Sequence, residues 1–245
     1  MDVKKFKKEY VVKSYEADAH GFLRLLALMN ILQDAADGSA MELGFGFEDC
    51  AKHGVSWVGS NYLLEIKRLP KMHEKFIIET WPAEAKLWGA IRDSVVYDEN
   101  GNILLKSSSQ WVLVDIVRKR PVPLAKHFSD YKALEERALN VEFSRPSAFE
   151  NPQTEQTFKV RFDDIDINKH VNNAVYPLWA SESVNSQWRE KNVPAKIELW
   201  FKKEALYGQT VKVLTKSEGM MTIHSITDET KENELARCNI VWRKL

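Results

Sequence analysis

The hydrophobic pattern of the chain alternates between helical and strand-like segments. Apolar residues at helical spacing, among them Leu25, Met29 and Leu32, predict a helix from Phe22 to about Ala36. Further apolar residues fill its other sides, so we expect protein to enclose this helix almost all round. Segments rich in β-branched and aromatic residues predict strands. These strands are expected at 62–68, 76–81, 90–97, 103–115, 197–203, 210–216, 220–227 and 235–243.

The same order of strand, helix and further strands occurs twice along the chain. Asp18 aligns with Asp166 at an offset of 148 residues, together with the strands and helices around them. The strand at 62–68 aligns with the strand at 197–203 at an offset of 135 residues, because the first copy has a longer connection after its helix. A helix that covers one face of an antiparallel sheet would explain each copy. The pattern therefore predicts an α+β fold built from two repeats.

The second helix is predicted from an apolar stripe that runs from Val171 to Trp179. Pro177 lies inside this stripe, so the helix either starts late or is kinked. The stretch from Ser129 to Pro152 is expected to form a short helix and then a linker. The predicted parts of the chain are an N-terminal repeat at 1–135, a linker at 136–153 and a C-terminal repeat at 154–245.

The segment 164–173 brings three kinds of polar group close together in the sequence. If it is extended, Asp164, Asp166 and Asn168 lie on one face. His170 would then lie near the first turn of the following helix, where free N–H groups favour negative charge. A carboxylate, a carboxamide and an imidazole at one place predict an active site. The alternative is a set of caps and turns before a helix.

The repeat supplies an internal comparison for these residues. The second copy has polar residues where the first is mostly apolar, so we expect the first copy to hold an apolar group and the second to perform the chemistry. The aligned pairs are Phe22 and His170, His20 and Asn168, and Leu69 and Glu204. For Glu204, which follows two lysines at a strand end, a solvated surface residue is the alternative interpretation.

Composition narrows the class of protein. The 35 basic and 35 acidic residues give a formal net charge of 0, so no overall field favours nucleic acid or a membrane surface. Cys50 and Cys238 form no CxxC motif, and the six histidines are scattered, so we expect a reduced, cytoplasmic protein without a metal or cofactor. No apolar run is long enough to span a bilayer, and the N-terminus lacks the apolar core of a signal peptide.

Segment 164–173 closely resembles the signature of plant-type acyl-acyl-carrier-protein thioesterases. Residues 199–205, Leu-Trp-Phe-Lys-Lys-Glu-Ala, also resemble a block of this family, at the family's distance from the histidine. Further similar segments lie at 14–16, 28–36, 80–81, 92–93 and 108–112. The resemblance covers nearly the whole chain and implies a double hotdog fold, two helix-in-sheet units in one chain. Plant members carry a transit peptide and an anchor segment that this sequence lacks, so we expect a bacterial member.

The resemblance implies hydrolysis of fatty acyl-acyl carrier protein, which releases free fatty acid and ends chain elongation. It assigns catalytic importance to the positions of Asp166, Asn168, His170 and Glu204. Many plant members have a cysteine at the position of Ala205, so a cysteine acyl-enzyme is not expected in this chain. Our hypothesis is that Glu204 and His170 deprotonate a water molecule, with Asn168 holding the water or the carbonyl oxygen. A carboxylate nucleophile, Asp166 or Glu204, is the alternative.

The expected partner is acyl carrier protein with its phosphopantetheine-linked acyl chain. The acyl chain is expected along the first helix, with Leu25, Leu28, Met29 and Leu32 as candidate liners, although each is equally typical of ordinary core. Because the carrier is acidic, basic patches should receive it. The candidates are Arg118, Lys119, Arg120, Lys202 and Lys203.

Two other functions are compatible with this sequence. One is an acyl-CoA thioesterase, since hotdog folds host both activities. The other is a non-catalytic acyl-binding hotdog protein, against which the presence of His170 and Glu204 in one copy alone argues. A hydroxyacyl dehydratase is less compatible, because its site usually lies across a subunit interface. The preferred acyl chain and the thiol carrier are left open, and a homodimer is one expectation.

Overall fold

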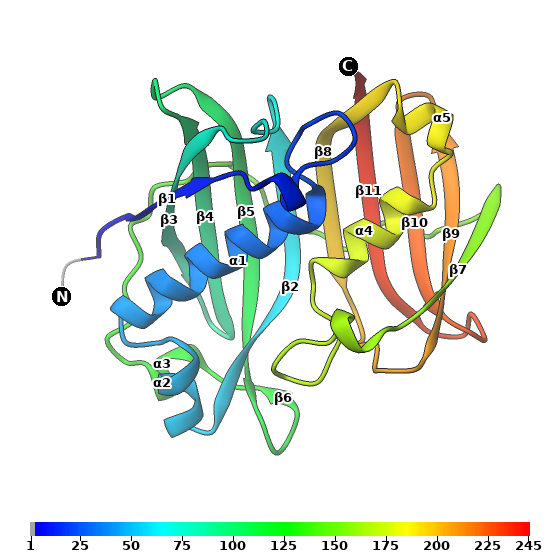
Figure 1. Ribbon diagram of the computed structural model, residues 1–245. Coiled ribbons are helices and arrows are strands. Elements are labelled where there is room, and N and C mark those ends of the chain that lie inside the picture. Colours follow the sequence, from blue (N-terminus) through cyan, green and yellow to red (C-terminus); the bar gives the residue numbers. More distant parts are fainter. Residues whose placement is uncertain (1–2) are drawn as a thin grey trace. The chain divides into compact units, whose positions relative to one another are not determined.

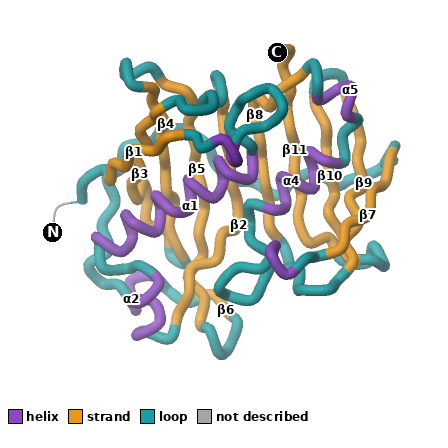
Figure 2. Tube along the Cα trace, in the orientation of Figure 1, coloured by secondary structure: helices purple, strands orange, loops and turns teal. Residues whose placement is uncertain are grey.

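The computed structural model of the protein describes residues 3–245 and divides into two units, Met1–Phe143 and Ser144–Leu245. Each unit contains an antiparallel β-sheet with one main helix lying across a face of that sheet (Figure 1). The tube in Figure 2 shows the same arrangement twice, with a purple helix lying across the orange strands in each unit. The predicted α+β class and the predicted repeat are confirmed.

The N-terminal unit holds the helix α1 (Leu25–Glu42) and a sheet in the order β1-β3-β4-β5-β2, with β6 paired to β5. All the strands predicted for this half are present. The strands are β1 (Phe6–Val11), β2 (Val55–Ile66), β3 (Lys75–Lys86), β4 (Gly89–Asp98), β5 (Ile103–Asp115) and β6 (Arg120–Pro121). The shorter helical elements are η1 (Ser14–Glu16), α2 (Phe47–Lys52) and α3 (Leu124–His127).

Helix α1 is amphipathic, so the prediction that protein encloses it almost all round is wrong. Its buried residues are Leu28, Met29, Leu32, Ala35 and Ser39. Exposed residues recur at helical spacing on the opposite side, at Asn30, Asp34 and Met41. The helix also continues to Glu42, well beyond the predicted end, because its buried stripe extends to Ser39.

The C-terminal unit holds the helix α4 (Val175–Glu182) and a sheet in the order β8-β11-β10-β9-β7. Pro177 is the third residue of α4, where its missing N–H has no intrahelical partner to lose, so the late start is the correct alternative. The strands are β7 (Thr154–Lys159), β8 (Asn192–Phe201), β9 (Thr210–Glu218), β10 (Met221–Asp228) and β11 (Glu234–Lys244). The shorter elements are η2 (Phe162–Asp164) and α5 (Ser186–Arg189).

The stretch 129–152 contains no helix, so the short helix predicted there is wrong; α3 ends before it begins. Its first part packs on the N-terminal sheet, where Arg137 Nε and the backbone N–H of Ala138 donate to the buried Asp93 carboxylate at 3.1 and 2.7 Å. From residue 144 the chain bonds to the C-terminal sheet, since Trp200 donates to the carbonyl of Ser144 at 2.7 Å. No helix within residues 3–245 is long and apolar enough to cross a membrane.

Candidate active site

The polar segment that begins at Asp164 is a closed loop, and the extended conformation predicted for it is wrong. Asp164 is buried and accepts the backbone N–H of Arg161 at 2.8 Å and its guanidinium at 2.6 Å. Asp166 Oδ1 accepts the backbone N–H groups of Asn168 and His170 at 2.8 and 3.3 Å. The carboxylates bond to nearby N–H groups, which competes with strand formation. The side chains of Asp164, Asp166 and Asn168 therefore do not share one face.

His170 and Glu204 form a close pair, which we call the dyad. His170 Nε2 lies 3.0 Å from Glu204 Oε2, and the two side chains are 24% and 51% exposed. Glu204 lies in the loop after β8, and this loop is joined to the histidine loop where Val171 donates to the carbonyl of Ala205 at 2.9 Å. A partly exposed imidazole beside a carboxylate can accept, hold and return a proton.

His170 lies on the loop before the following helix, outside the helix itself. Helix α4 begins at Val175, because a turn intervenes in which Asn172 Oδ1 accepts the N–H of Ala174 at 2.9 Å. The dyad depends on loop hydrogen bonds.

Tyr176 supports the dyad, and sequence reasoning missed it. Its hydroxyl accepts the backbone N–H of Ala205, next to Glu204, at 3.1 Å, and its ring is buried in α4. Burial, followed by the nearby charges of Glu204 and Asp166, raises the pKa of Tyr176 to about 12, so the hydroxyl keeps its proton. The available signal was the repeat, because the residue aligned with Tyr176 at an offset of 148 is the apolar Leu28.

The histidine loop has a counterpart with the same hydrogen bonds in the N-terminal unit. Asp18 Oδ1 accepts the N–H groups of His20 and Phe22 at 2.9 and 3.0 Å, as Asp166 does in its own loop. The equivalence shows that a carboxylate at this position closes the loop even where Phe22 stands at the position of His170. Asp166 therefore has a structural role that is independent of catalysis.

The second loop of the dyad is repeated as well. In the N-terminal unit Leu23 donates to the carbonyl of Pro70 at 2.8 Å, which matches the bond between the two dyad loops. Leu23 and Pro70 are the residues that align with Val171 and Ala205 at the offsets of 148 and 135 residues. Phe22 and Leu69, one residue before each, therefore occupy the positions of the two dyad residues. The repeated framework thus carries an apolar pair in one unit and a titratable pair in the other.

The remaining predicted residues are not gathered at the dyad. Asn168 is exposed, and within the described part of the chain its side chain makes no hydrogen bond to either dyad residue. Lys202 is paired with Glu234, and Lys203 bonds to Asn233. The candidate basic residues Arg118, Lys119 and Arg120 are all exposed in and after the turn between β5 and β6.

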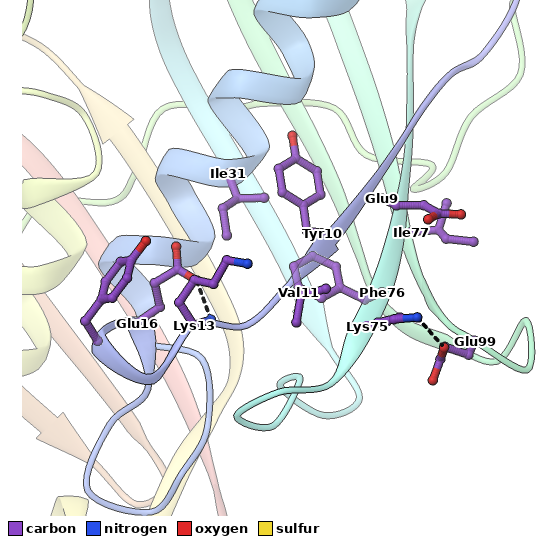
Figure 3. Close-up of a pocket in the computed structure, with 11 residues that line it drawn as sticks. Glu9, Tyr10, Val11, Lys13, Glu16, Ile31, Lys75, Phe76, Ile77 and Glu99 are labelled. Atoms are coloured by element: carbon purple, nitrogen blue, oxygen red, sulfur yellow. Dashed lines mark hydrogen bonds and ion pairs between the residues drawn. The ribbon is translucent and has the colours of Figure 1, made fainter.

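The predicted acyl-chain liners belong to the core of the N-terminal unit. Leu28, Met29 and Leu32 are buried on the stripe of α1 described above, and Leu25 is partly buried at the start of the helix. A pocket of about 580 Å³ lies elsewhere in this unit, and none of the predicted liners contributes to it (Figure 3). It is lined by Glu9, Tyr10, Val11, Lys13, Tyr15, Glu16, Ile31, Lys75, Phe76, Ile77 and Glu99.

Both cysteines are buried and lie outside the dyad loops. Burial raises the pKa of the Cys50 thiol to about 12 and raises the pKa of Cys238 further. Neither thiol is therefore ionised near neutral pH, which is unfavourable for nucleophilic attack. Among residues 3–245, no group of three or more His, Cys, Asp and Glu side chains is arranged to hold a metal ion.

Both units match models of one protein family. Residues 3–131 match the acyl-ACP thioesterase N-terminal domain, and residues 148–244 match the acyl-ACP thioesterase C-terminal domain. Oleoyl-acyl carrier protein thioesterase 2, a chloroplastic protein of Arabidopsis thaliana, is 26% identical over 231 residues, covering 87% of this chain and 63% of that protein. The chain spans between about half and two thirds of the length of the curated relatives that it matches most strongly.

Solved structures share the fold over the full length of the chain. A Lactobacillus plantarum protein provisionally named an oleoyl thioesterase has a TM-score of 0.88 and 26% identity, with 100% of this chain and 98% of that chain covered. The 12:0-ACP thioesterase of Umbellularia californica has a TM-score of 0.85 and 23% identity, with 98% of each chain covered. These likenesses confirm the double hotdog fold. The chain belongs to the acyl-ACP thioesterase family.

Proposed function

We propose that the chain hydrolyses the thioester of fatty acyl-acyl carrier protein, releasing free fatty acid and ending chain elongation. The observation that carries this proposal is the dyad, in which His170 Nε2 lies 3.0 Å from Glu204 Oε2. Membership of a family named for this activity supports it. The apolar pair at the equivalent positions of the N-terminal unit supports a specific role for the polar pair.

The dyad geometry suggests a general-base mechanism. If His170 donates its Nε2–H to Glu204, the lone pair on Nδ1 is free to accept a proton from water. The resulting hydroxide attacks the thioester carbonyl, and the imidazolium returns the proton to the departing thiolate. Glu204 holds the tautomer and stabilises the imidazolium, a type of contribution worth roughly 10²–10⁴-fold. Asn168, on the same loop, remains the candidate for holding the water or the carbonyl oxygen.

A carboxylate nucleophile is the competing mechanism. Asp166 suits this role poorly, because its Oδ1 already accepts two loop N–H groups and Asp18 performs the same task in the other unit. Glu204 remains the candidate for an acyl-anhydride intermediate. A single turnover in ¹⁸O-labelled water tests for the anhydride. Label in the Glu204 carboxylate would exclude attack by water alone, whereas label in the fatty acid alone results from attack by water and also from an anhydride opened at its fatty acyl carbonyl.

The substrate class is tested by comparing one acyl chain on two thiols. We expect saturation at low acyl-carrier-protein concentration and much weaker saturation with the same acyl chain on coenzyme A. Preference for coenzyme A would make the protein an acyl-CoA thioesterase. Tight binding of fatty acid without turnover of either substrate would make it an acyl-binding protein.

The path of the acyl chain, the residues that dock the carrier, the oligomeric state and the cellular location belong to the same proposal. We expect the acyl chain along α1, with Leu25, Leu28, Met29 and Leu32 beside it after the core adjusts. The relatives described above are named for both oleoyl and 12:0 substrates, so the preferred length must be measured. Docking of the carrier at Arg118, Lys119, Arg120 or Lys203 stays a prediction, and Lys202 suits it less well because Glu234 already neutralises its charge. A homodimer and a cytoplasmic location also stay predictions.

A further inference from the structure

We propose that acyl carrier protein docks on four residues beside the dyad: Phe162, Ile167, Lys169 and Tyr207. We call this set the rim surface. The inference rests on the proposed function, because it concerns the partner that delivers the thioester to His170. It goes further in naming where the carrier binds and which side chains distinguish a carrier-linked substrate from a small thioester.

The apolar members of the rim surface are strongly exposed. Phe162, Ile167 and Tyr207 are 76%, 77% and 64% exposed, and the rings of Phe162 and Tyr207 meet edge to face with centroids 5.8 Å apart. Phe162 and Ile167 come from the segment that leads to His170, and Tyr207 from the loop that carries Glu204. Large exposed apolar side chains that gather beside a polar site are typical of protein interaction surfaces.

The N-terminal unit shows that the loop does not need these side chains. Its loop has the same hydrogen bonds around Asp18, yet it carries small residues at three of the four equivalent positions, the exception being Met72. The aligned pairs are Ser14 and Phe162, Ala19 and Ile167, Gly21 and Lys169, and Met72 and Tyr207. At the positions of Phe162, Ile167 and Lys169 the larger group therefore appears only in the unit that has the dyad. Closure of the loop does not require these three side chains, and contact with a partner would account for their exposure.

Lys169 adds a positive charge directly before His170. Its backbone is left-handed, with φ of +66°, and the equivalent Gly21 has φ of +77°. Glycine is the favoured residue at such an angle, so a lysine there is strained. Lys169 is exposed and forms no ion pair with any residue from 3 to 245. Its charge is thus available to a partner, unlike that of Arg161, which Asp164 holds at 2.6 Å.

An acidic carrier fits this surface in both position and charge. Its thioester must reach the dyad, so the carrier must lie over the loops that present His170 and Glu204. Phe162, Ile167 and Tyr207 would supply apolar anchors, and Lys169 would attract the acidic surface and steer the encounter. A substrate without a protein carrier would not use these contacts.

The repeat itself supplies the test variants. Phe162→Ser, Ile167→Ala and Lys169→Gly each introduce the residue found in the first copy, and Lys169→Gly should also relieve backbone strain. For each variant kcat and KM are measured with an acyl chain on the carrier and with the same acyl chain on pantetheine, which has neither protein nor phosphate. We expect KM for the carrier substrate to rise by about tenfold, with pantetheine kinetics changed by less than about twofold.

One control and two binding measurements complete the experiment. Tyr15→Ser removes an aromatic side chain that is 74% exposed in the corresponding turn of the N-terminal unit, and it should leave both substrates unaffected. Calorimetric binding of the acyl carrier to a His170→Ala chain, with and without the rim substitutions, measures docking without turnover. Raising the salt concentration should weaken binding less in Lys169→Gly than in the parent chain.

The outcomes separate this inference from the proposed function. Hydrolysis of the carrier substrate with KM and affinity unchanged in all rim variants would overturn the docking surface and leave the function standing. Equal losses with both substrates would also overturn it, because the variants would then act on the dyad. Rim-dependent binding without hydrolysis by the wild type would support the surface and overturn the function. Absence of any carrier binding would overturn both.

Discussion

His170 and Glu204 lie 3.0 Å apart between Nε2 and Oε2, although each side chain belongs to a different loop. The N-terminal unit builds the same two loops with the same backbone bond between them, and it places Phe22 and Leu69 at the equivalent positions. The polar pair is therefore an addition to a repeated framework and is not required by the fold. This relationship allows catalytic and structural effects to be separated by comparing the two units.

Glu204→Gln should damage catalysis much more than stability. The amide can still accept a hydrogen bond from His170, but it cannot stabilise an imidazolium by charge, so we expect kcat/KM for an acyl-carrier substrate to fall by roughly 10²-fold or more. The free energy of unfolding should change by less than about 1 kcal/mol, because the side chain is half exposed. The control is Glu190→Gln, at an exposed position outside the dyad loops. Activity within a few-fold of wild type would contradict the proposed role.

Asp166 and Asp18 should be equivalent for stability and different for turnover. Substitution of either by Ala removes the acceptor of two backbone N–H groups, so urea denaturation should show a loss of about 1 kcal/mol in each case. The Asn variants keep one oxygen acceptor and should recover most of that loss. Only Asp166→Ala displaces His170, so only that variant should lower kcat strongly. If Asp166→Ala abolished turnover with stability unchanged, the loop-closing role would be refuted.

Tyr176→Phe should loosen the Glu204 loop. It leaves the buried N–H of Ala205 without its acceptor, which costs about 1–3 kcal/mol in the free energy of unfolding. The loop should then hold Glu204 less well, and kcat should fall by about tenfold. The exposed Tyr15→Phe removes a hydroxyl in the other unit and should change neither quantity. Wild-type stability in Tyr176→Phe would show that this hydrogen bond does not hold the loop.

The sheets and the repeat were predictable because their signals are periodic and occur twice. The helix limits were less predictable: α1 runs past Ala36 because its buried stripe continues to Ser39, and Pro177 left two alternatives for α4. The extended reading of the segment after Asp164 failed because carboxylates compete locally for backbone N–H groups. The alternation of side chains along the sequence carries no information about this competition.

For the candidate site, the meeting of His170 and Glu204 was indicated by the difference between the copies. The contribution of Tyr176 was not predicted, although the same comparison of the copies aligns this tyrosine with the apolar Leu28. A tyrosine on an apolar helix face is usually core, and its polar role depends on a hydrogen bond to a loop 29 residues away. The ion pair between Lys202 and Glu234 was not predictable, because it depends on which strands lie side by side in the sheet. Sequence spacing alone does not give that order.

His224 should make the stability of the protein fall in mildly acidic solution. It is buried on β10, where hydrogen bonds of 2.9 and 2.8 Å join its ring to Thr215 and Thr222, and burial lowers its pKa to about 3. The unfolded chain binds this proton near pH 6.5 and the folded chain does not, so stability is full above pH 6.5 and declines below it. The decline is at most about 1.4 kcal/mol per pH unit for one proton.

Urea denaturation at several pH values between 7 and 5 measures this effect above the range in which most carboxylates titrate. His224→Gln should flatten the dependence in that range, whereas His20→Gln, at an exposed position, should leave it as in the wild type. An unchanged slope in His224→Gln would show that this histidine is not the group responsible.

The most direct measurement of the central claim is hydrolysis of a panel of acyl-carrier-protein thioesters of different chain length by the wild type and by His170→Ala, with circular dichroism of both. We predict turnover by the wild type and a fall of roughly 10²-fold or more in the variant, with superimposable spectra. The wild-type rates would also define the preferred chain length. Equal activity in the two proteins, or no activity in either, would contradict the assignment of the dyad as the catalytic centre.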